Sequence, residues 1–372
     1  MSVKLKNYVV GRPVNQWIEP MSVDRPTTSV TLGPGDDPQA FIDQYDEIHL
    51  KPGETYRWCR VTANKPFRLI GHGATVQLFG VGPILRHYGD PAQSGQTVIR
   101  DVSFVDAAGT PARGEPFGEK LMDYIGLEFQ DATQVTVQNC RFLNFRGTAL
   151  WFYDTVPYTG FKWDMQHIVL GCRFRGCRIA ISNGGGTEYS IASNNTFWDC
   201  QICFNTTGGN WNCSGNLIVN CRSGYFHSQN TWYAGPQGNK NAAHGSFVGN
   251  TVNHCDYGGC LWPTPFIQAD GSTVQLAGFY FDDTLQRPPT WTGNTMYYCD
   301  TMIKNFLVNG TDTYCLTGCA IFGTAATAQD SGKIEVGDAV KDKVYLTGCT
   351  GNGVTLKNVK AANVVPTFGT VK

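Results

Sequence analysis

The sequence predicts an all-β solenoid, a single column of stacked coils, and three observations lead to this prediction. A short motif recurs through most of the chain, its copies are rich in β-branched and aromatic residues, and glycine and asparagine punctuate them. The composition agrees with a folded chain. The 372 residues include 43 glycines, 41% are hydrophobic and only 16% are charged, which excludes a disordered chain or a coiled coil.

The recurring motif is a Gly or Asn, then an Asn or Cys, with an apolar residue two positions after the Asn or Cys. Its copies begin at Asn139-Cys140, Gly171-Cys172, Asn194-Asn195, Gly215-Asn216, Gly249-Asn250, Gly293-Asn294, Gly318-Cys319 and Gly348-Cys349. Successive copies are 21 to 44 residues apart, which indicates a basal period in the low twenties with insertions. Such a period is too short for a helix and a strand in every repeat. Each coil can therefore bury its apolar residue only against the next coil.

Two columns of small side chains follow from this repeat. Asn195, Asn216, Asn250 and Asn294 are expected to form an internal amide ladder, in which each side chain hydrogen-bonds to its neighbours above and below. Cysteine replaces Asn at four copies, Cys140, Cys172, Cys319 and Cys349, and a second column holds Cys177, Cys200, Cys221, Cys255 and Cys299. Nine of the 14 cysteines are thus predicted to be buried thiols that pack as small hydrophobic groups.

Two other roles for the cysteines remain open. Cys203 with Cys213, or Cys315 with Cys319, are the pairs expected if disulfides form in an oxidising medium. Cys200 and Cys203 also have the two-residue gap of a zinc site, but Cys200 already has a place in a column. We expect no metal and no cofactor.

Before the repeats, residues 35–43 predict a short capped helix, and residues 48–58 predict a strand, Pro-Gly-x-Thr-Tyr and a second strand. Phe67-Arg68-Leu69-Ile70-Gly71-His72-Gly73 follows. This order resembles the opening of right-handed parallel β-helix proteins of the pectate-lyase-like group, in which bacteriophage tailspikes and other virion appendages are well represented.

The resemblance implies a right-handed, single-stranded parallel β-helix of roughly ten coils over residues 32–355. Residues 1–31 would form an N-terminal attachment segment that contacts other virion proteins, and residues 356–372 a C-terminal end segment. It further implies a homotrimer on the surface of a virus particle, with loops on the flank of the column touching a host surface polysaccharide.

Charge and hydropathy exclude several partners. Lys and Arg number 29 and Asp and Glu 30, so the net charge is −1, and no basic run is present; a nucleic-acid partner is not expected. No apolar stretch approaches the roughly 18 residues of a membrane span, and the start lacks the apolar core of a signal peptide. We therefore expect no membrane insertion, synthesis in the host cytoplasm without a signal peptide, and a final location on the virion surface.

Aromatic residues are the candidates for binding a glycan or a partner protein, because several lie in or beside the insertions, where a solenoid core does not need them. They are Trp198, Trp211, Trp232, Tyr233, Trp262 and Trp291. The alternative is that these rings pack under loops or between subunits.

Catalysis would need two carboxylates that flank a glycosidic bond. The candidates are the adjacent Asp282 and Asp283, with Asp256 and Asp270 on other coils. Adjacent residues of a strand point to opposite faces, so Asp282 and Asp283 cannot act together without a partner from another coil. The sequence therefore favours a structural spike or tail appendage for glycan adhesion or particle decoration. The alternatives are a tailspike-type depolymerase, a glycoside hydrolase or lyase, and a capsid decoration or linking protein without a ligand.

Overall fold

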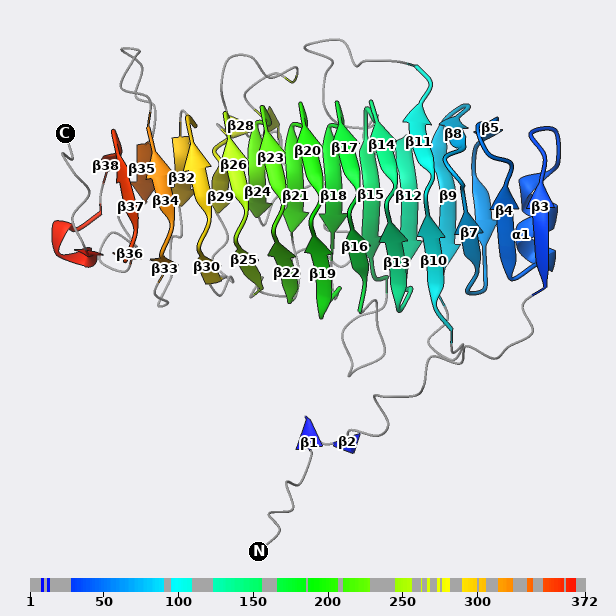
Figure 1. Cartoon of the computed structure of the whole chain (residues 1–372), viewed down its shortest axis with the longest axis horizontal. Helices are drawn as coiled ribbons and strands as arrows, with labels where there is room; N and C mark the ends of the chain where they lie inside the picture. The colour runs from blue at the N-terminus through cyan, green and yellow to red at the C-terminus, as the bar shows by residue number, and fades with distance from the viewer. Residues whose placement is uncertain are drawn as a thin grey trace, which may run out of the picture.

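In the computed structural model the chain forms one long column of β-strands, with the strands of successive coils side by side along its length (Figure 1). The structure describes residues 8–9, 12–13, 28–89, 95–108, 123–155, 166–184, 187–206, 210–227, 245–255, 262, 266–267, 273–274, 276–281, 290–299, 301–305, 314–323, 333–336, 344–357 and 359–365.

Three parallel sheets of 13, 11 and 11 strands form the column. The first sheet contains β3 (Ser29–Leu32), β4 (Glu47–Leu50), β7 (Arg68–Ile70), β10 (Thr97–Arg100), β13 (Val135–Gln138), β16 (Ile168–Leu170), β19 (Ser190–Ser193), β22 (Trp211–Ser214), β25 (Ser246–Val248), β30 (Thr290–Thr292), β33 (Tyr314–Thr317), β36 (Val344–Thr347) and β39 (Val364–Val365). The second contains β5 (Thr55–Trp58), β8 (Thr75–Leu78), β11 (Ser103–Asp106), β14 (Arg141–Leu143), β17 (Arg173–Arg175), β20 (Thr196–Trp198), β23 (Leu217–Val219), β26 (Thr251–Asn253), β31 (Thr295–Tyr297), β34 (Ala320–Phe322) and β37 (Thr350–Asn352). The third contains β6 (Val61–Ala63), β9 (Gly82–Tyr88), β12 (Tyr124–Gln130), β15 (Thr148–Tyr153), β18 (Ile179–Asn183), β21 (Ile202–Thr206), β24 (Ser223–His227), β29 (Phe279–Phe281), β32 (Thr301–Asn305), β35 (Lys333–Val336) and β38 (Thr355–Lys357).

Each complete coil contributes one strand to each sheet, β3 and β39 add one further strand at each end of the first sheet, and every strand of the column pairs in parallel with the strand one coil away. This confirms the predicted right-handed parallel β-helix. The short elements outside the three sheets are the pairs β1 (Tyr8–Val9) with β2 (Arg12–Pro13) and β27 (Phe266–Ile267) with β28 (Thr273–Val274), and the 3-10 turn η3 (Ala361–Asn363).

The helix α1 (Pro38–Gln44) lies at the N-terminal end of the column, as the sequence predicts (Figure 1). Asp37 caps it by accepting a hydrogen bond from the Gln39 backbone N–H at 3.0 Å, and Pro38 begins its first turn. The Gln39 side chain exchanges two 2.8 Å hydrogen bonds with the backbone of Thr62, which ties the helix to β6.

The expected limits of the column need a small correction at both ends. The first sheet already begins with β3 at Ser29, so the boundary placed after residue 31 falls inside a strand. At the other end, β38 crosses the boundary placed after residue 355, and β39 lies beyond it. The end strands β3 and β39 lie in turns without a copy of the Asn/Cys motif, so the repeat alone does not predict them.

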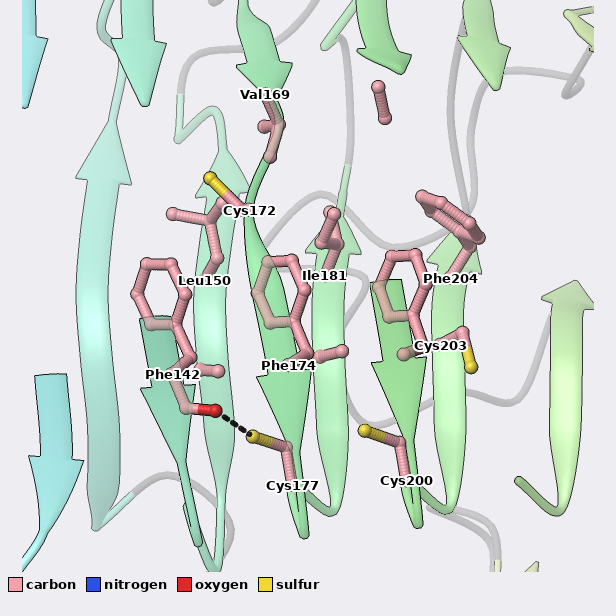
Figure 2. Close-up of a cluster of buried hydrophobic side chains, with 14 of the residues drawn as sticks. Phe142, Leu150, Val169, Cys172, Phe174, Cys177, Ile181, Cys200, Cys203 and Phe204 are labelled. Atoms are coloured by element: carbon pink, nitrogen blue, oxygen red, sulfur yellow. Dashed lines mark hydrogen bonds between the residues drawn. The ribbon is translucent and has the colours of Figure 1, made fainter. Parts of the chain in front are cut away.

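The core repeats the predicted inward apolar residue from coil to coil, except in the last coil, where Gly351 takes the position. Phe104, Phe142, Phe174 and Phe197 stack one above the other, with ring centroids 4.9 to 5.3 Å apart. Figure 2 shows part of this stack, with the Phe142 and Phe174 rings in register. The same position is continued by Ile218, Val252, Met296 and Ile321, all buried. Offset aromatic pairs add about 0.5 to 1.5 kcal/mol each beyond the area they bury.

The predicted amide ladder is present and its geometry is regular. The Oδ1 atom of Asn216 accepts from the backbone N and Nδ2 of Asn195, at 2.9 and 3.1 Å, and Asn250 and Asn294 repeat this pattern one coil further on. Each Nδ2 also donates to a strand carbonyl of the preceding coil, for example from Asn250 to Cys213 at 3.0 Å. Every polar atom of these buried amides therefore has a partner in the stack.

Cysteine continues the same ladder where Asn is absent. Cys172 Sγ contacts the Val137 carbonyl at 3.5 Å, which is the position that Asn195 Nδ2 takes on Val169 one coil later. The second column is present as well, with Cys177, Cys200, Cys221, Cys255 and Cys299 all buried. All 13 described cysteines are free thiols, including Cys203, Cys213, Cys315 and Cys319. The ladder positions thus explain most of the unusual cysteine content.

Three described histidines are buried, His87, His167 and His227, and the first two pack against aromatic rings of the core. His87 bonds the Ala63 carbonyl through Nδ1 and Thr97 Oγ1 through Nε2, both at 3.2 Å. His167 stacks on Phe152 with ring centroids 4.5 Å apart. Burial lowers the pKa of His87 to about 4, although its bond to Ala63 opposes the shift. Burial and the nearby His87 lower the pKa of His167 to about 3.

His87 and His167 should make the stability of the folded protein sensitive to acid. Their folded pKa values lie below the unfolded value of about 6.5, so the stability they contribute is complete above that pH and is lost as the pH falls toward 4 and 3. At about pH 5 the loss for the pair should be on the order of 4 kcal/mol. Urea unfolding of His167→Phe, which keeps an aromatic ring in the stack, should show about half of this pH dependence. His254→Gln, in a turn outside the core, should keep the full pH dependence. If the free energy of unfolding changed equally with pH in both variants, His167 would not be a source of the acid sensitivity.

Candidate functional site

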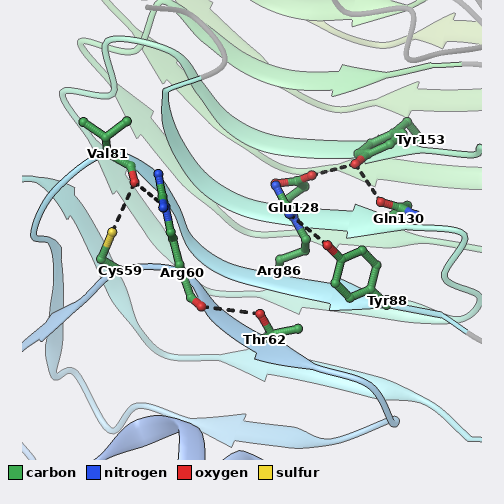
Figure 3. Close-up of polar contacts among 9 residues, drawn as sticks. All are labelled: Cys59, Arg60, Thr62, Val81, Arg86, Tyr88, Glu128, Gln130 and Tyr153. Carbon is green, nitrogen blue, oxygen red and sulfur yellow. Dashed lines mark hydrogen bonds and ion pairs between the residues drawn. The ribbon is translucent and has the colours of Figure 1, made fainter.

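An ion pair between a partly exposed arginine and a buried glutamate lies on the outer face of the third sheet, near the N-terminal end of the column (Figure 3). Arg86 on β9 and Glu128 on β12 are direct register partners, and their neighbours His87 and Phe129 point into the core, so this pair points outward. Arg86 Nη2 lies 2.9 Å from Glu128 Oε2, and the Glu128 side chain is only 1% exposed. A carboxylate so deeply buried needs such a partner.

Two tyrosines and a glutamine complete this polar cluster. Tyr153 on β15 donates to Glu128 Oε1 at 2.6 Å and lies 3.0 Å from Gln130 Oε1, while Arg86 Nη1 donates to the Tyr88 hydroxyl at 2.9 Å. The Tyr153 ring stacks on Trp151 with centroids 4.1 Å apart. Burial and the Glu128 carboxylate both raise the pKa of Tyr153, so its hydroxyl stays protonated and keeps donating.

A pocket of about 460 Å³ opens beside the cluster. Its polar lining comes from Arg60, Thr62, Arg86 and Asp123, and its apolar lining from Val81 and Pro83. Arg60 is held by a 2.9 Å bond from its Nε to the Val81 carbonyl (Figure 3). The pocket lining holds two guanidinium groups and one carboxylate, Asp123, and Arg86 is also paired with the buried Glu128. This arrangement offers fixed donors and acceptors for a hydroxyl-rich ligand, and it brings no second carboxylate opposite Asp123 within the pocket lining.

Three further carboxylates of the described chain, Asp106, Asp131 and Glu335, are held in structural contacts. Asp106 is almost fully buried and receives two hydrogen bonds from Arg146, at 2.8 and 3.1 Å. Asp131 accepts from the backbone and hydroxyl of Thr155, and Glu335 lies between Lys333 and Lys357. Within the described residues, no three His, Cys, Asp or Glu side chains are grouped as metal ligands, and no helix is both long enough and apolar enough to cross a membrane.

The four candidate catalytic acids, Asp256, Asp270, Asp282 and Asp283, lie outside the described residues, so their arrangement stays a prediction. Trp232 and Tyr233 lie outside them too. The pocket residues were not expected from the sequence, because Arg60, Arg86 and Asp123 belong to early coils that lack the Asn/Cys motif.

The described tryptophans divide into buried and exposed rings. Trp211 and Trp291 point into the core of the first sheet, each about 3% exposed, and Trp262 is 2% exposed, so the expectation that they offer a ring face to a ligand is wrong in this structure. Trp262 instead packs over the buried Arg178, with the guanidinium carbon 5.4 Å from the ring centroid. Trp198 is 45% exposed and remains a candidate.

Trp198 belongs to an aromatic strip that the sequence did not predict. Its register partners along the outer face of the second sheet are Val219, Asn253, Tyr297 and Phe322. Tyr297 and Phe322 stack with centroids 5.0 Å apart, and Tyr298, 39% exposed, follows in the turn. We call Trp198, Val219, Tyr297, Tyr298 and Phe322 the aromatic strip. The sequence does contain a signal for the strip, since all five residues stand three or four positions after the Asn or Cys of the repeat.

The three sheets and the internal ladders define a parallel β-helix protein with polar and aromatic residues on its outer faces. Residues 26–234, more than half of the chain, match the family described as adenovirus EB1 55K protein / large t-antigen. The chain belongs to this family. None of the curated protein sequences is significantly similar to it.

Several solved structures are similar to this chain over most of its length. The catalytic domain of a GH87 α-1,3-glucanase in complex with nigerose has a TM-score of 0.47 at 13% identity, over 90% of this chain and 56% of that one. The tailspike protein of Acinetobacter baumannii phage AM24 has a TM-score of 0.48 at 11% identity, over 87% and 52%. The Dettilon tailspike protein has a TM-score of 0.46 at 11% identity, over 88% and 62%. The chain thus spans 52 to 62% of the length of these three structures.

Proposed function

We propose that the protein is a structural component of the surface of a virus particle, a rigid column that presents its flank to a partner. It would assemble as a homotrimer, with residues 1–31 in contact with other virion proteins. The family description names an adenovirus protein, which supports a viral origin. The ladders and the stacked core suit a mechanical role, because each coil is fixed to its neighbours by hydrogen bonds and ring contacts.

The aromatic strip is the observation that carries this proposal. On the outer side of the second sheet, Trp198 is 45% exposed and Tyr298 is 39% exposed. Exposed aromatic groups of this kind mark sites where another protein or a sugar ring packs. A column whose flank displays exposed rings, and several of whose described carboxylates are held by arginine or lysine, fits presentation and docking better than bond cleavage.

Substitution in the strip tests the proposal. Trp198→Ala combined with Tyr298→Ala should reduce incorporation of the chain into purified virus particles, or the binding of those particles to host cells, by roughly tenfold or more, because two central aromatic residues of an interface are worth about 1 to 2 kcal/mol each. Phe79→Ala removes a 62% exposed ring elsewhere on the second-sheet side and should change neither quantity. Normal incorporation and normal cell binding of the double variant would contradict the proposal.

A further inference from the structure

Two histidine rings meet on the outer face of the first sheet, close to the N-terminal end of the column. His49 Nδ1 lies 2.9 Å from His72 Nε2, and the rings are nearly coplanar, 14° apart. The other nitrogen of His49, Nε2, lies 2.9 Å from Glu47 Oε1. Arg68 lies 3.5 Å from the second oxygen of Glu47. The carboxylate therefore fixes the proton of His49 on Nε2 and leaves its Nδ1 as a lone pair that points at His72.

Rigid elements hold both rings. His49 lies on β4, which pairs with β3 on one side and β7 on the other. His72 lies in the turn after β7 with a left-handed backbone, φ 49°, and the flanking Gly71 and Gly73 donate to the Arg100 and Asp101 carbonyls at 2.9 and 2.8 Å. His49 and His72 are 23 residues apart, one coil of the column. The fold therefore sets the distance between the two nitrogens.

We propose that His49 Nδ1 and His72 Nε2 are the protein ligands of a transition-metal ion, with Cu²⁺, Ni²⁺ and Zn²⁺ as the class that imidazole favours. Glu47 is a positioning residue that holds His49 by its other ring nitrogen, as carboxylates commonly do for metal-binding histidines. On binding, the proton of His72 Nε2 is lost to solvent and His72 Nδ1 takes one up, so the neutral pair presents two lone pairs with no net proton release. Water fills the remaining positions, because both rings are at the surface.

The distance between the nitrogens fits this role. Two imidazole nitrogens at about 2.0 to 2.1 Å from one ion lie roughly 2.9 Å apart when they subtend a right angle, and roughly 3.3 Å apart in a tetrahedral site. The observed 2.9 Å matches the right angle of a tetragonal ion, for which the order of affinities also favours Cu²⁺. In the structure the two nitrogens point at each other at hydrogen-bond distance, so the ion replaces this hydrogen bond and both rings tilt until their lone pairs meet at the ion. The bound ion would bridge the coils of β4 and β7.

Copper titration of the full chain tests the site. Because thiols also bind copper, Cys59→Ser and Cys315→Ser should be introduced first, which removes the two described thiols that are not buried. In this background, Cu²⁺ at micromolar concentration should give an electron paramagnetic resonance spectrum with hyperfine splitting from two imidazole nitrogens. Titration calorimetry should show one equivalent bound to this site.

Single substitutions test whether His49 and His72 bind the copper ion. His72→Gln should lose that equivalent and the two-nitrogen splitting, and His49→Gln, at an ordinary strand position, should do the same if the turn does not tolerate the first substitution. His254→Gln should keep both signals, and Glu47→Gln should keep the two-nitrogen splitting while weakening binding about 10-fold or more. The proposal is overturned if the background protein binds no copper at micromolar concentration, or if His72→Gln and His49→Gln leave the two-nitrogen spectrum unchanged.

Discussion

Replacing Asn250 with aspartate should lower the free energy of unfolding by about 3 to 5 kcal/mol at pH 7, because it places a carboxylate inside the amide ladder. Asn250 Nδ2 donates to the Cys213 carbonyl and to Asn294 Oδ1, both at 3.0 Å, and both partners are acceptors that an aspartate oxygen would repel. The Oδ1 atom of Asn250 accepts hydrogen bonds from Asn216, and an aspartate oxygen could still accept them. The side chain is buried, so water cannot replace the lost donors.

The effect of Asn250→Asp should also depend on pH. Burial among acceptors is expected to raise the pKa of the new carboxyl above its ordinary value of about 3.9, because the charged form is the one that the site destabilises. A folded pKa above the unfolded value means that the penalty is full at high pH and shrinks as the pH falls through the folded pKa. Urea unfolding at about pH 7 and about pH 5.5 should therefore show a smaller difference from the parent protein at the lower value.

Asn250→Cys is the matched control for the ladder. Cys172 occupies the same position of another coil and reaches the same kind of strand carbonyl with its Sγ atom, so the backbone there accepts a thiol. The thiol loses part of the amide hydrogen bonding but introduces no charge, and its cost should be about 1 to 2 kcal/mol without pH dependence below about pH 8. Equal stabilities of the Asp and Cys variants would contradict an internal position for Asn250.

The ladders and the coil order could be predicted from the sequence because their cause is local and repeated. Asn195, Asn216 and Asn250 stand at the same position of successive turns, and only stacking satisfies three buried amides at that spacing. The early coils lack this motif. The pairs Arg86 with Glu128 and His49 with His72 depend on which strands become neighbours, and with sequence separations of 42 and 23 residues nothing in their local surroundings marks them.

Side-chain direction limited the prediction of binding residues. Trp211 and Trp198 both lie close to motif copies, yet Trp211 begins β22 and points into the core whereas Trp198 ends β20 and points outward. In a strand, a shift of one position reverses the face, so an error of one residue in the strand boundary exchanges a core ring for a surface ring. Trp262 shows a further limit, since a ring outside the three sheets is buried by its contact with Arg178.

Removing the cation of the buried pair should be the second large effect. Arg86→Met leaves Glu128 with Tyr153 as its hydrogen-bond donor in a site that excludes water, and we expect a loss of about 3 to 5 kcal/mol in the free energy of unfolding. Glu128→Leu removes the carboxylate and leaves Tyr153 without that acceptor, at a cost of about 2 to 3 kcal/mol. The double variant should be more stable than Arg86→Met alone, because no uncompensated charge remains buried.

The double-mutant cycle measured by urea unfolding separates the pair from its surroundings. A coupling energy of about 2 kcal/mol or more is expected for Arg86 with Glu128. Lys357 with Glu335 is the matched pair on the same sheet face, with a 2.7 Å contact but a lysine that is 53% exposed, and its coupling should stay below about 1 kcal/mol. A coupling for Arg86 and Glu128 as small as that of the exposed pair would mean that water reaches the Glu128 carboxylate. The outer face of the third sheet would then be open in solution, and the pocket beside Arg60 would lose the fixed guanidinium groups that give it a defined shape.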